Sequence, residues 1–254
     1  MKTLCLLALA PLATVVACPA PPPPPPPPPP DITAACTDPT TVPCQTAMLQ
    51  DLNMITDGSV TAGVVESTDN GDHFHAHVDA SVGGLNGQGY VYAKFTDTGL
   101  VRVELDDVSS LDSMDWDVAF HRFVIRLNSG TGGPSCVTAA RTAANTDFAA
   151  LATVDTGLTF NAEAFMTDGT CDMIPDGSGL GTDPGVVLQS YWHYVGCLQM
   201  TGNVYVIERA DGHHVKLVVN DFYDEAAQAE CNTAGTLAAN HQSAQLQFDW
   251  AFLD

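Results

Sequence analysis

The chain has 254 residues, enough for one or two domains with a sizeable core, and its 8 Lys and Arg against 30 Asp and Glu give a formal net charge of −22. This charge repels phosphate backbones and argues against nucleic-acid binding, and it equally disfavours docking on an anionic membrane through a basic patch. Hydrophobic residues make up 45% of the chain, so the composition indicates a folded protein rather than a disordered one.

The N-terminus is typical of an exported protein. Lys2 precedes an apolar run from Leu4 to Val16 that is too short to span a bilayer as a helix. The run leads into Val-Ala-Cys, which resembles the lipobox of bacterial lipoproteins and predicts cleavage before a lipidated Cys18. Ordinary secretion with cleavage near Ala17 or Ala20 is the alternative. Acyl chains on Cys18 would anchor the protein at the outer membrane or cell surface without a spanning segment.

An unbroken proline run from Pro21 to Pro30 follows the candidate anchor. Proline fixes φ and lacks an amide donor, so this run favours polyproline II, a semi-rigid stalk of roughly 30 Å at about 3.1 Å per residue. We therefore expect a signal peptide over residues 1–17, a lipidated cysteine and stalk over 18–31, and a single domain over 32–254.

Six cysteines remain when Cys5 and Cys18 are set aside: Cys36, Cys44, Cys136, Cys171, Cys197 and Cys231. An even number in an exported chain predicts disulfides, and 15 pairings are open by simple enumeration. Cys36 and Cys44 are near neighbours in sequence, which favours a local bridge between them. No CxxC spacing is present, which argues against a redox dithiol or a zinc site.

The body of the chain alternates short β-rich runs with Gly, Asp and Asn turns, which predicts an all-β, mainly antiparallel fold with a few short helices. Predicted strands cover, in chain order, residues 90–95, 100–105, 120–127, 204–207, 215–219 and 245–252. Predicted helices cover residues 40–52, 139–151 and 225–229. There is no GxSxG elbow, HExxH, phosphate-binding glycine loop or SxxK pair, so the sequence does not predict an enzyme.

Two groups of residues could bind a ligand. His73, His75 and His77 would share one face of an extended strand and could bind a divalent metal such as Zn²⁺ or Cu²⁺. The alternative is a solvated polar face on an edge strand. The second group lies between residues 165 and 200 and combines Met166, Met173, His193 and Met200 with Tyr191, Trp192 and Tyr194. Haem iron accepts His nitrogen or Met sulfur, although such residues more often fill a core.

The stretch Asp-Trp-Asp-Val-Ala-Phe-His-Arg at residues 115–122, followed by Ile-Arg-Leu-Asn-Ser-Gly-Thr-Gly-Gly at 125–133, resembles the WDxAxxR…NSGxxG signature of the HmuY family. The hairpin around Ala-Asp-Gly at residues 210–212 is similar to that family's C-terminal block, and the resemblance covers roughly residues 77–254. It implies a hand-shaped β domain that binds haem, in a bacterial lipoprotein acting as a haemophore that passes haem to an outer-membrane receptor. It also implies that Trp116 and His121 belong to the scaffold.

In the resembled family two loops supply the axial ligands, and His193 lies in the region of the second. The region of the first, about residues 160–176, has no histidine here and offers Met166 and Met173, so the resemblance implies a His/Met pair. With so few cations, we expect iron ligation and apolar contact, rather than ion pairs to the propionates, to hold the haem. The alternatives are a surface lipoprotein that keeps this scaffold without haem, and a divalent-metal-binding protein that uses His73, His75 and His77.

Overall fold

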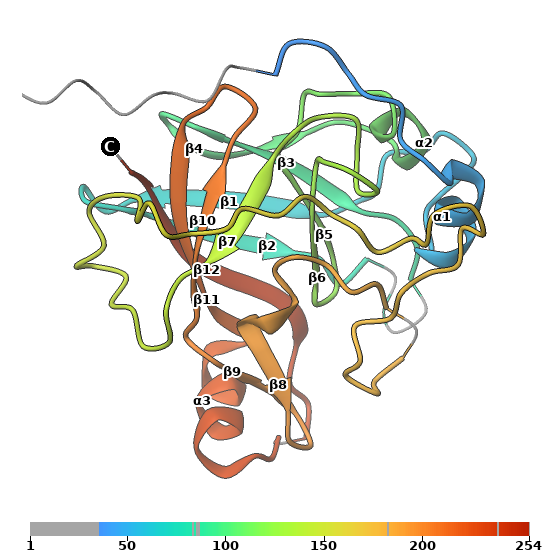
Figure 1. Cartoon of the computed structure of the whole chain (residues 1–254). Helices are drawn as coiled ribbons and strands as arrows, with labels where there is room; N and C mark the ends of the chain where they lie inside the picture. Colours follow the sequence, from blue (N-terminus) through green and yellow to red (C-terminus); the bar gives the residue numbers. More distant parts are fainter. Residues whose placement is uncertain (1–35, 83, 85–86, 182, 238, 254) are drawn as a thin grey trace, which may run out of the picture. The chain divides into compact units, whose positions relative to one another are not determined.

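The computed structural model describes residues 36–82, 84, 87–181, 183–237 and 239–253 (Figure 1). The expected signal peptide, Cys18 and the proline stalk lie outside this range. Within it, no helix combines the length and the apolar character needed to cross a membrane. The described residues belong to one compact unit.

Antiparallel sheets make up most of the described chain, which confirms the predicted fold class. The larger sheet has the order β1 (Val64–Asp69), β2 (Phe74–Asp79), β12 (Ser243–Leu253), β11 (His214–Tyr223), β10 (Val204–Glu208) and β7 (Thr138–Arg141). The second has the order β4 (Gly99–Val103), β3 (Val91–Thr96), β5 (Val118–His121) and β6 (Val124–Leu127), and β8 (Trp192–Tyr194) pairs with β9 (Leu198–Met200). The helical elements are α1 (Gln45–Asp51), α2 (Asp107–Ser110), the 3-10 helix η2 (Gln189–Tyr191) and α3 (Glu225–Ala234).

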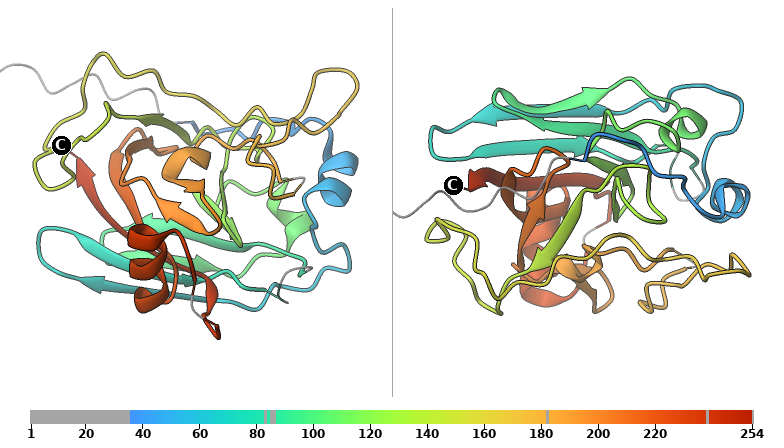
Figure 2. Two further views of the ribbon diagram at one scale, coloured as in Figure 1. Left: turned by 90° about the horizontal axis from the view of Figure 1, so that it is seen from below. Right: turned by 45° about the horizontal axis from the view of Figure 1, so that its top comes forward.

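Aromatic side chains join the two larger sheets. Trp250 of β12 stacks on Phe74 with ring centroids 4.6 Å apart and meets Phe95 of β3 edge-on at 4.9 Å, while Phe120 of β5 lies 5.8 Å from Phe248 of β12. Each fully buried side chain of this size contributes roughly 1.5–3 kcal/mol. The long segment between β7 and β8 has little regular structure and runs along the outside of the strands (yellow to gold in Figure 2).

The strand expected over residues 120–127 is instead a tight hairpin. Phe120 of β5 pairs with Ile125 of β6, and Arg122 between them adopts φ 50°, which reverses the chain. Every residue of β5 and β6 is buried. Because both faces are covered, the alternation of side chains carried no information about where the strand ends.

The prediction of a helix over residues 139–151 is wrong. Residues 138–141 form β7, which pairs with β10, and Asn145 beyond it has φ 63°. Pairing at the sheet edge overrides the helix propensity of the Ala-rich run. The other two helices are confirmed with different bounds, α1 being shorter than expected and α3 longer. Asp224 caps α3 by accepting from Ala227 N–H, and Gly235 ends it with φ 68°.

Disulfides link Cys36 to Cys136, Cys44 to Cys171 and Cys197 to Cys231. The expectation of disulfides is confirmed, but the local Cys36–Cys44 bridge is wrong, because these cysteines pair with partners 100 and 127 residues away. The segment that carries them is bound across the domain, where Thr40 N–H donates to Pro134 O at 2.8 Å. Proximity in the sequence therefore did not indicate which cysteines pair.

Candidate functional site

The tryptophan motif forms scaffold. Trp116 is fully buried and donates from Nε1 to Ser110 O at 3.1 Å. Asp117 accepts from Phe95 N–H at 2.9 Å, as expected of a carboxylate that satisfies a backbone donor. His121 is 3% exposed and its Nδ1 lies 2.8 Å from Gly89 O. Burial lowers the pKa of His121, so this imidazole is held neutral inside the core.

Arg126 supplies a buried cation behind this motif. Its guanidinium lies 4.6 Å from the centre of the Tyr90 ring and 5.0 Å from that of Trp116, and it donates to Gly132 O at 2.8 Å and to Tyr92 Oη at 3.0 Å. Such contacts compensate the loss of hydration of a buried guanidinium. Arg126, which lies between the two blocks of the motif, therefore belongs to the core.

Glu163 ties the scaffold to the segment that leads into the candidate site. Its carboxylate accepts from Leu127 N–H and from Val187 N–H, each at 3.0 Å. Burial raises its pKa to about 7, against the effect of these two donors. Gly132 packs here so closely that a Cβ would collide with Leu127 O, and its Cβ would lie 2.8 Å from Glu163 Cγ. The glycine-rich turn is thus required by close packing.

The β8–β9 hairpin carries His193 and is held by α3. The Cys197–Cys231 disulfide joins the two, Gln228 Nε2 donates to Leu198 O at 2.9 Å, and Asn232 Oδ1 accepts from Met200 N–H at 3.0 Å. Side chains of the helix thereby satisfy backbone groups of β9 that have no neighbouring strand. The helix and the hairpin lie together at the bottom of Figure 1.

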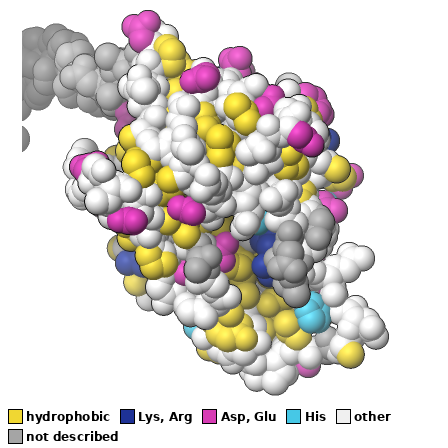
Figure 3. Space-filling model, turned by 90° about the vertical axis from the view of Figure 1, so that its right-hand side faces the viewer, with side chains coloured by type: hydrophobic (Ala, Val, Ile, Leu, Met, Phe, Trp, Pro, Cys, Tyr) yellow, Lys and Arg dark blue, Asp and Glu magenta, His cyan; other side chains and the backbone are white. Residues whose placement is uncertain are grey.

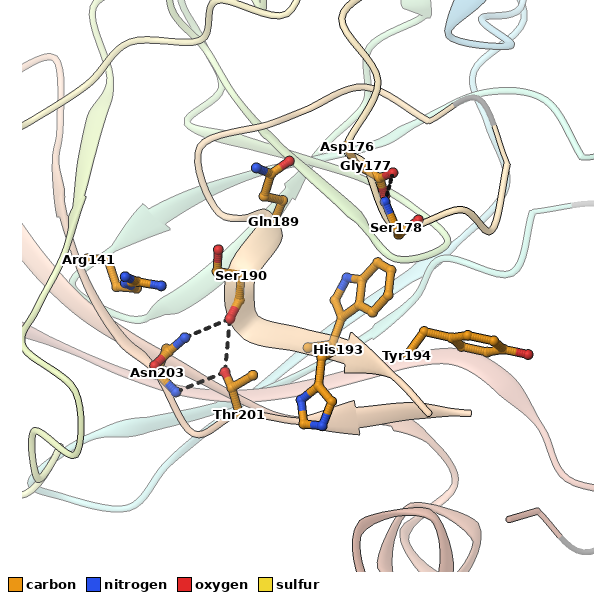
Figure 4. Close-up of a pocket in the computed structure, with 11 residues that line it drawn as sticks. Arg141, Asp176, Gly177, Ser178, Gln189, Ser190, His193, Tyr194, Thr201 and Asn203 are labelled. Carbon is orange, nitrogen blue, oxygen red and sulfur yellow. Dashed lines mark hydrogen bonds between the residues drawn. The ribbon is translucent and has the colours of Figure 1, made fainter. Parts of the chain in front are cut away.

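A cavity of about 390 Å³ opens beside this hairpin (Figure 4). Its lining comes from the end of β7, the segment before β8, strand β8 and the connection between β9 and β10, and comprises Arg141, Asp176, Gly177, Ser178, Gln189, Ser190, Trp192, His193, Tyr194, Thr201 and Asn203. This volume is in the range of small-molecule sites. A second hollow of about 320 Å³ shares Tyr194 and is lined by Phe123, Leu180 and Phe222 among others.

Hydrophobic side chains gather near these two hollows. Figure 3 shows acidic side chains spread over the visible face, while hydrophobic ones collect toward its lower part beside basic and histidine side chains. Tyr194 and Val195 at the hairpin tip are 49% and 45% exposed, and Ile174 on the preceding segment is 43% exposed. The lining of the cavity that contains His193 is itself mainly polar, and Trp192 and Tyr194 are its aromatic side chains.

His193, which the sequence indicated as a candidate ligand of haem iron, lies in the cavity lining. Its side chain is exposed, and none of the described residues hydrogen-bonds its imidazole. Strand alternation sets it on the face of β8 opposite to Trp192 and Tyr194, and Figure 4 shows the ring on the other side of the strand from Asp176 and Ser178. The imidazole is therefore available to a metal centre that enters from that side.

The two methionines lie elsewhere. Met166 and Met173 form an isolated antiparallel bridge, Met166 is 5% exposed in the core, and Met173 packs half-buried against it. Neither lines the cavity that contains His193. The structure thus brings His193 to a cavity but does not bring a thioether to the same cavity.

Of the three histidines that the sequence places on one strand face, His75 and His77 lie in β2, while His73 precedes it. No group of three His, Cys, Asp or Glu side chains that could hold a metal occurs among the described residues. His75 Nδ1 lies 2.8 Å from Asp249 Oδ1 and His77 Nε2 lies 2.9 Å from Gln245 Oε1, while His73 precedes the strand and contacts Asp72. β2 lies between β1 and β12, so the alternative of an edge strand is wrong.

Sequence reasoning missed Arg141, Ser190 and Asn203, which line the cavity with His193. Arg141 was assigned to a helix, and its neighbour across the sheet, Tyr205, comes from a strand more than 60 positions later. The only available signal was the scarcity of cations, 8 in 254 residues, which makes each exposed arginine notable.

Comparisons with known proteins agree with the motif. The sequence model described as HmuY protein matches residues 86–234, more than half of the chain. Similar solved structures include a lipoprotein from Bacteroides fragilis, with 13% identity and a TM-score of 0.44 over 76% of this chain and 95% of that one. A HmuY-like haem-binding protein from Bacteroides vulgatus has 13% identity and a TM-score of 0.46 over 76% of this chain and 96% of that one. The apo HmuY analogue of Tannerella forsythia has 16% identity and a TM-score of 0.40 over 77% of this chain and 98% of that one. The comparison with curated proteins gave no significant match. The extent of the family match, which includes the tryptophan motif, shows that this chain is a member of the HmuY family.

Proposed function

We propose that the protein is a haem-binding protein and not an enzyme, and that it takes haem at the cavity beside β8 and β9. The observation that carries the proposal is the exposed His193 imidazole, which no described residue hydrogen-bonds, in a cavity lined also by Trp192 and Tyr194. Haem iron binds imidazole nitrogen, and His193 presents its imidazole on the face of β8 opposite to Trp192 and Tyr194. Membership in the HmuY family supports this choice of ligand.

The second axial ligand in this proposal is a thioether of the Met166–Met173 pair. Met173 is half-buried and can reach a ligand with less repacking than Met166, which is 5% exposed. Haem binding then requires the segment that carries Met173 to approach the hairpin. Thioether ligation favours the ferrous state, because sulfur is the softer donor.

The wider role in the proposal is haem capture outside the cell. The protein is anchored through a lipidated Cys18, the proline stalk spaces the domain from the outer membrane or cell surface, and haem passes to an outer-membrane receptor. The signal peptide and lipobox in the sequence and the three disulfides support export.

The test is a spectroscopic titration of the purified protein with haem. We expect a shifted Soret band in the wild type and at least a tenfold loss of affinity in His193→Ala, because the axial nitrogen is removed. His213→Ala is the matched control, since His213 is an exposed histidine on the β10–β11 turn and is absent from the cavity lining. Met173→Leu is expected to change the ferrous spectrum more than Met166→Leu. An unshifted Soret band, or equal binding by the His193 and His213 variants, would contradict the proposal.

A further inference from the structure

Arg141 lines one end of the cavity, and the buried Tyr205 lies beside it in the sheet. They are directly opposite each other in the β7–β10 pairing, and opposite residues project from the same face of a sheet. Asn203 precedes Tyr205 by two positions and projects from the same side. Figure 4 shows Arg141, Ser190 and Asn203 around the same part of the opening.

Both groups have unused hydrogen-bonding capacity. The exposed Arg141 guanidinium has neither a hydrogen bond nor an ion pair with any part of the chain that the structure describes. Tyr205 is 1% exposed, and its hydroxyl finds no hydrogen-bond partner within the described ranges, although Ser190 and Asn203 are close to it. Burial raises the pKa of Tyr205 and the charge of Arg141 opposes that rise, which places the two groups in electrostatic contact. Arg141 is therefore a donor in the cavity lining without an acceptor among the described residues, and the Tyr205 hydroxyl lies beside Ser190 and Asn203 of that lining.

The remaining charges of the cavity do not neutralise Arg141. Asp176 is the acidic residue of the lining, its Oδ1 accepts from Ser178 N–H at 2.9 Å, and Figure 4 shows it across the opening from Arg141. A planar guanidinium presents paired N–H groups that match the two oxygens of a carboxylate. A ligand carboxylate at this end would satisfy Arg141 and Tyr205 together.

We propose that Arg141, assisted by the Tyr205 hydroxyl, forms a carboxylate subsite, so that the protein recognises a planar ligand through a carboxylate side arm such as a haem propionate. This inference rests on the proposed function, because it takes haem as the ligand. It differs from the expectation that iron ligation and apolar contact alone hold the ligand. The competing explanation is that Arg141 is an edge-strand charge that prevents strand pairing, since β7 is the last strand of its sheet.

The test compares haem with haem dimethyl ester, in which both propionates are esterified. We expect Arg141→Ala to weaken binding of haem at least tenfold and to change binding of the ester less than twofold, with an unchanged Soret maximum because the axial ligands are intact. Arg141→Lys should retain part of the affinity, and Tyr205→Phe should show a smaller loss for haem alone. Lys94→Ala, which removes a half-buried cation from β3 outside this cavity, is the control.

Two outcomes would overturn the inference. If Arg141→Ala affects haem and its ester equally, or affects neither, Arg141 has no role toward the carboxylate and is an edge-strand charge. If the wild type binds neither compound, the proposed function has failed and the subsite with it. Selective loss of haem binding with retained ester binding supports both.

Discussion

At the residue scale, the core behind the motif contains a network of buried charges. Arg126 offsets Asp107 and Glu163, each of which is buried and has a pKa raised by that burial. Asp107 accepts from Tyr90 N–H at 3.1 Å and from Ile55 N–H at 2.6 Å, so it also joins the N-terminal segment to β3. Removing one member of such a buried network leaves a buried partner uncompensated.

Glu163 makes stability depend on pH in a defined direction. Its pKa is about 7 in the folded protein and 4.5 in the unfolded chain, so the folded state binds the proton more tightly. The contribution of Glu163 to the free energy of unfolding is therefore greatest below pH 4.5 and falls as pH rises to 7, by on the order of 3 kcal/mol. Urea unfolding at several pH values should show that Glu163→Gln, which cannot titrate, lacks this loss. The prediction would be contradicted if the free energies of unfolding of the variant and the wild type changed with pH in parallel.

At the scale of elements, the β8–β9 hairpin depends on α3, whose side chains hydrogen-bond the free backbone edge of β9. Gln228 is fully buried, and its Oε1 accepts from Phe222 N–H at 2.9 Å while its Nε2 donates to Leu198 O. Asn232 follows one helical turn later and accepts from Met200 N–H. The helix thus fixes the strand that pairs with the one carrying His193.

Asn232→Ala tests this support. Met200 N–H loses its acceptor, so we expect its hydrogen exchange to accelerate, stability to fall by about 0.5–1.5 kcal/mol, and haem affinity to weaken several-fold. Thr233→Ala is the control, because the Thr233 hydroxyl donates to Ala229 O at 2.8 Å within the same helix. Exchange at Met200 that is equal in the two variants would show that Asn232 does not hold the hairpin.

At the scale of the whole described domain, the disulfides tie the segments that the sheets leave loose. Cys36–Cys136 and Cys44–Cys171 bind the N-terminal segment to the loop after β6 and to the segment with the methionines, and Cys197–Cys231 binds the hairpin to α3. Cross-links between distant residues reduce the entropy of the unfolded chain more than local ones.

Removing the long-range disulfide Cys44–Cys171 and removing the hairpin disulfide Cys197–Cys231 should affect stability and haem affinity to different extents. Chain-entropy arithmetic predicts a loss of about 5 kcal/mol for the Cys44→Ala/Cys171→Ala pair, whose partners are 127 residues apart, and about 4 kcal/mol for Cys197→Ala/Cys231→Ala, whose partners are 34 apart. Urea unfolding and haem titration on both double variants check this. We expect the second pair to lose more haem affinity despite its smaller loss of stability. The reverse order of affinities would contradict a positioning role for Cys197–Cys231.

The sequence by itself determined the β class, the hairpins around Gly99 and Gly212, the presence of disulfides and the family, because these depend on local turn chemistry, side-chain alternation and a contiguous motif. It also indicated His193, which the structure places in the lining of a cavity. Only the tertiary structure decided the disulfide pairing, the hairpin at Arg122, and the meeting of Arg141 with Tyr205. Those features depend on contacts between segments far apart in the chain, and no local pattern of residues records which distant strand will become a neighbour.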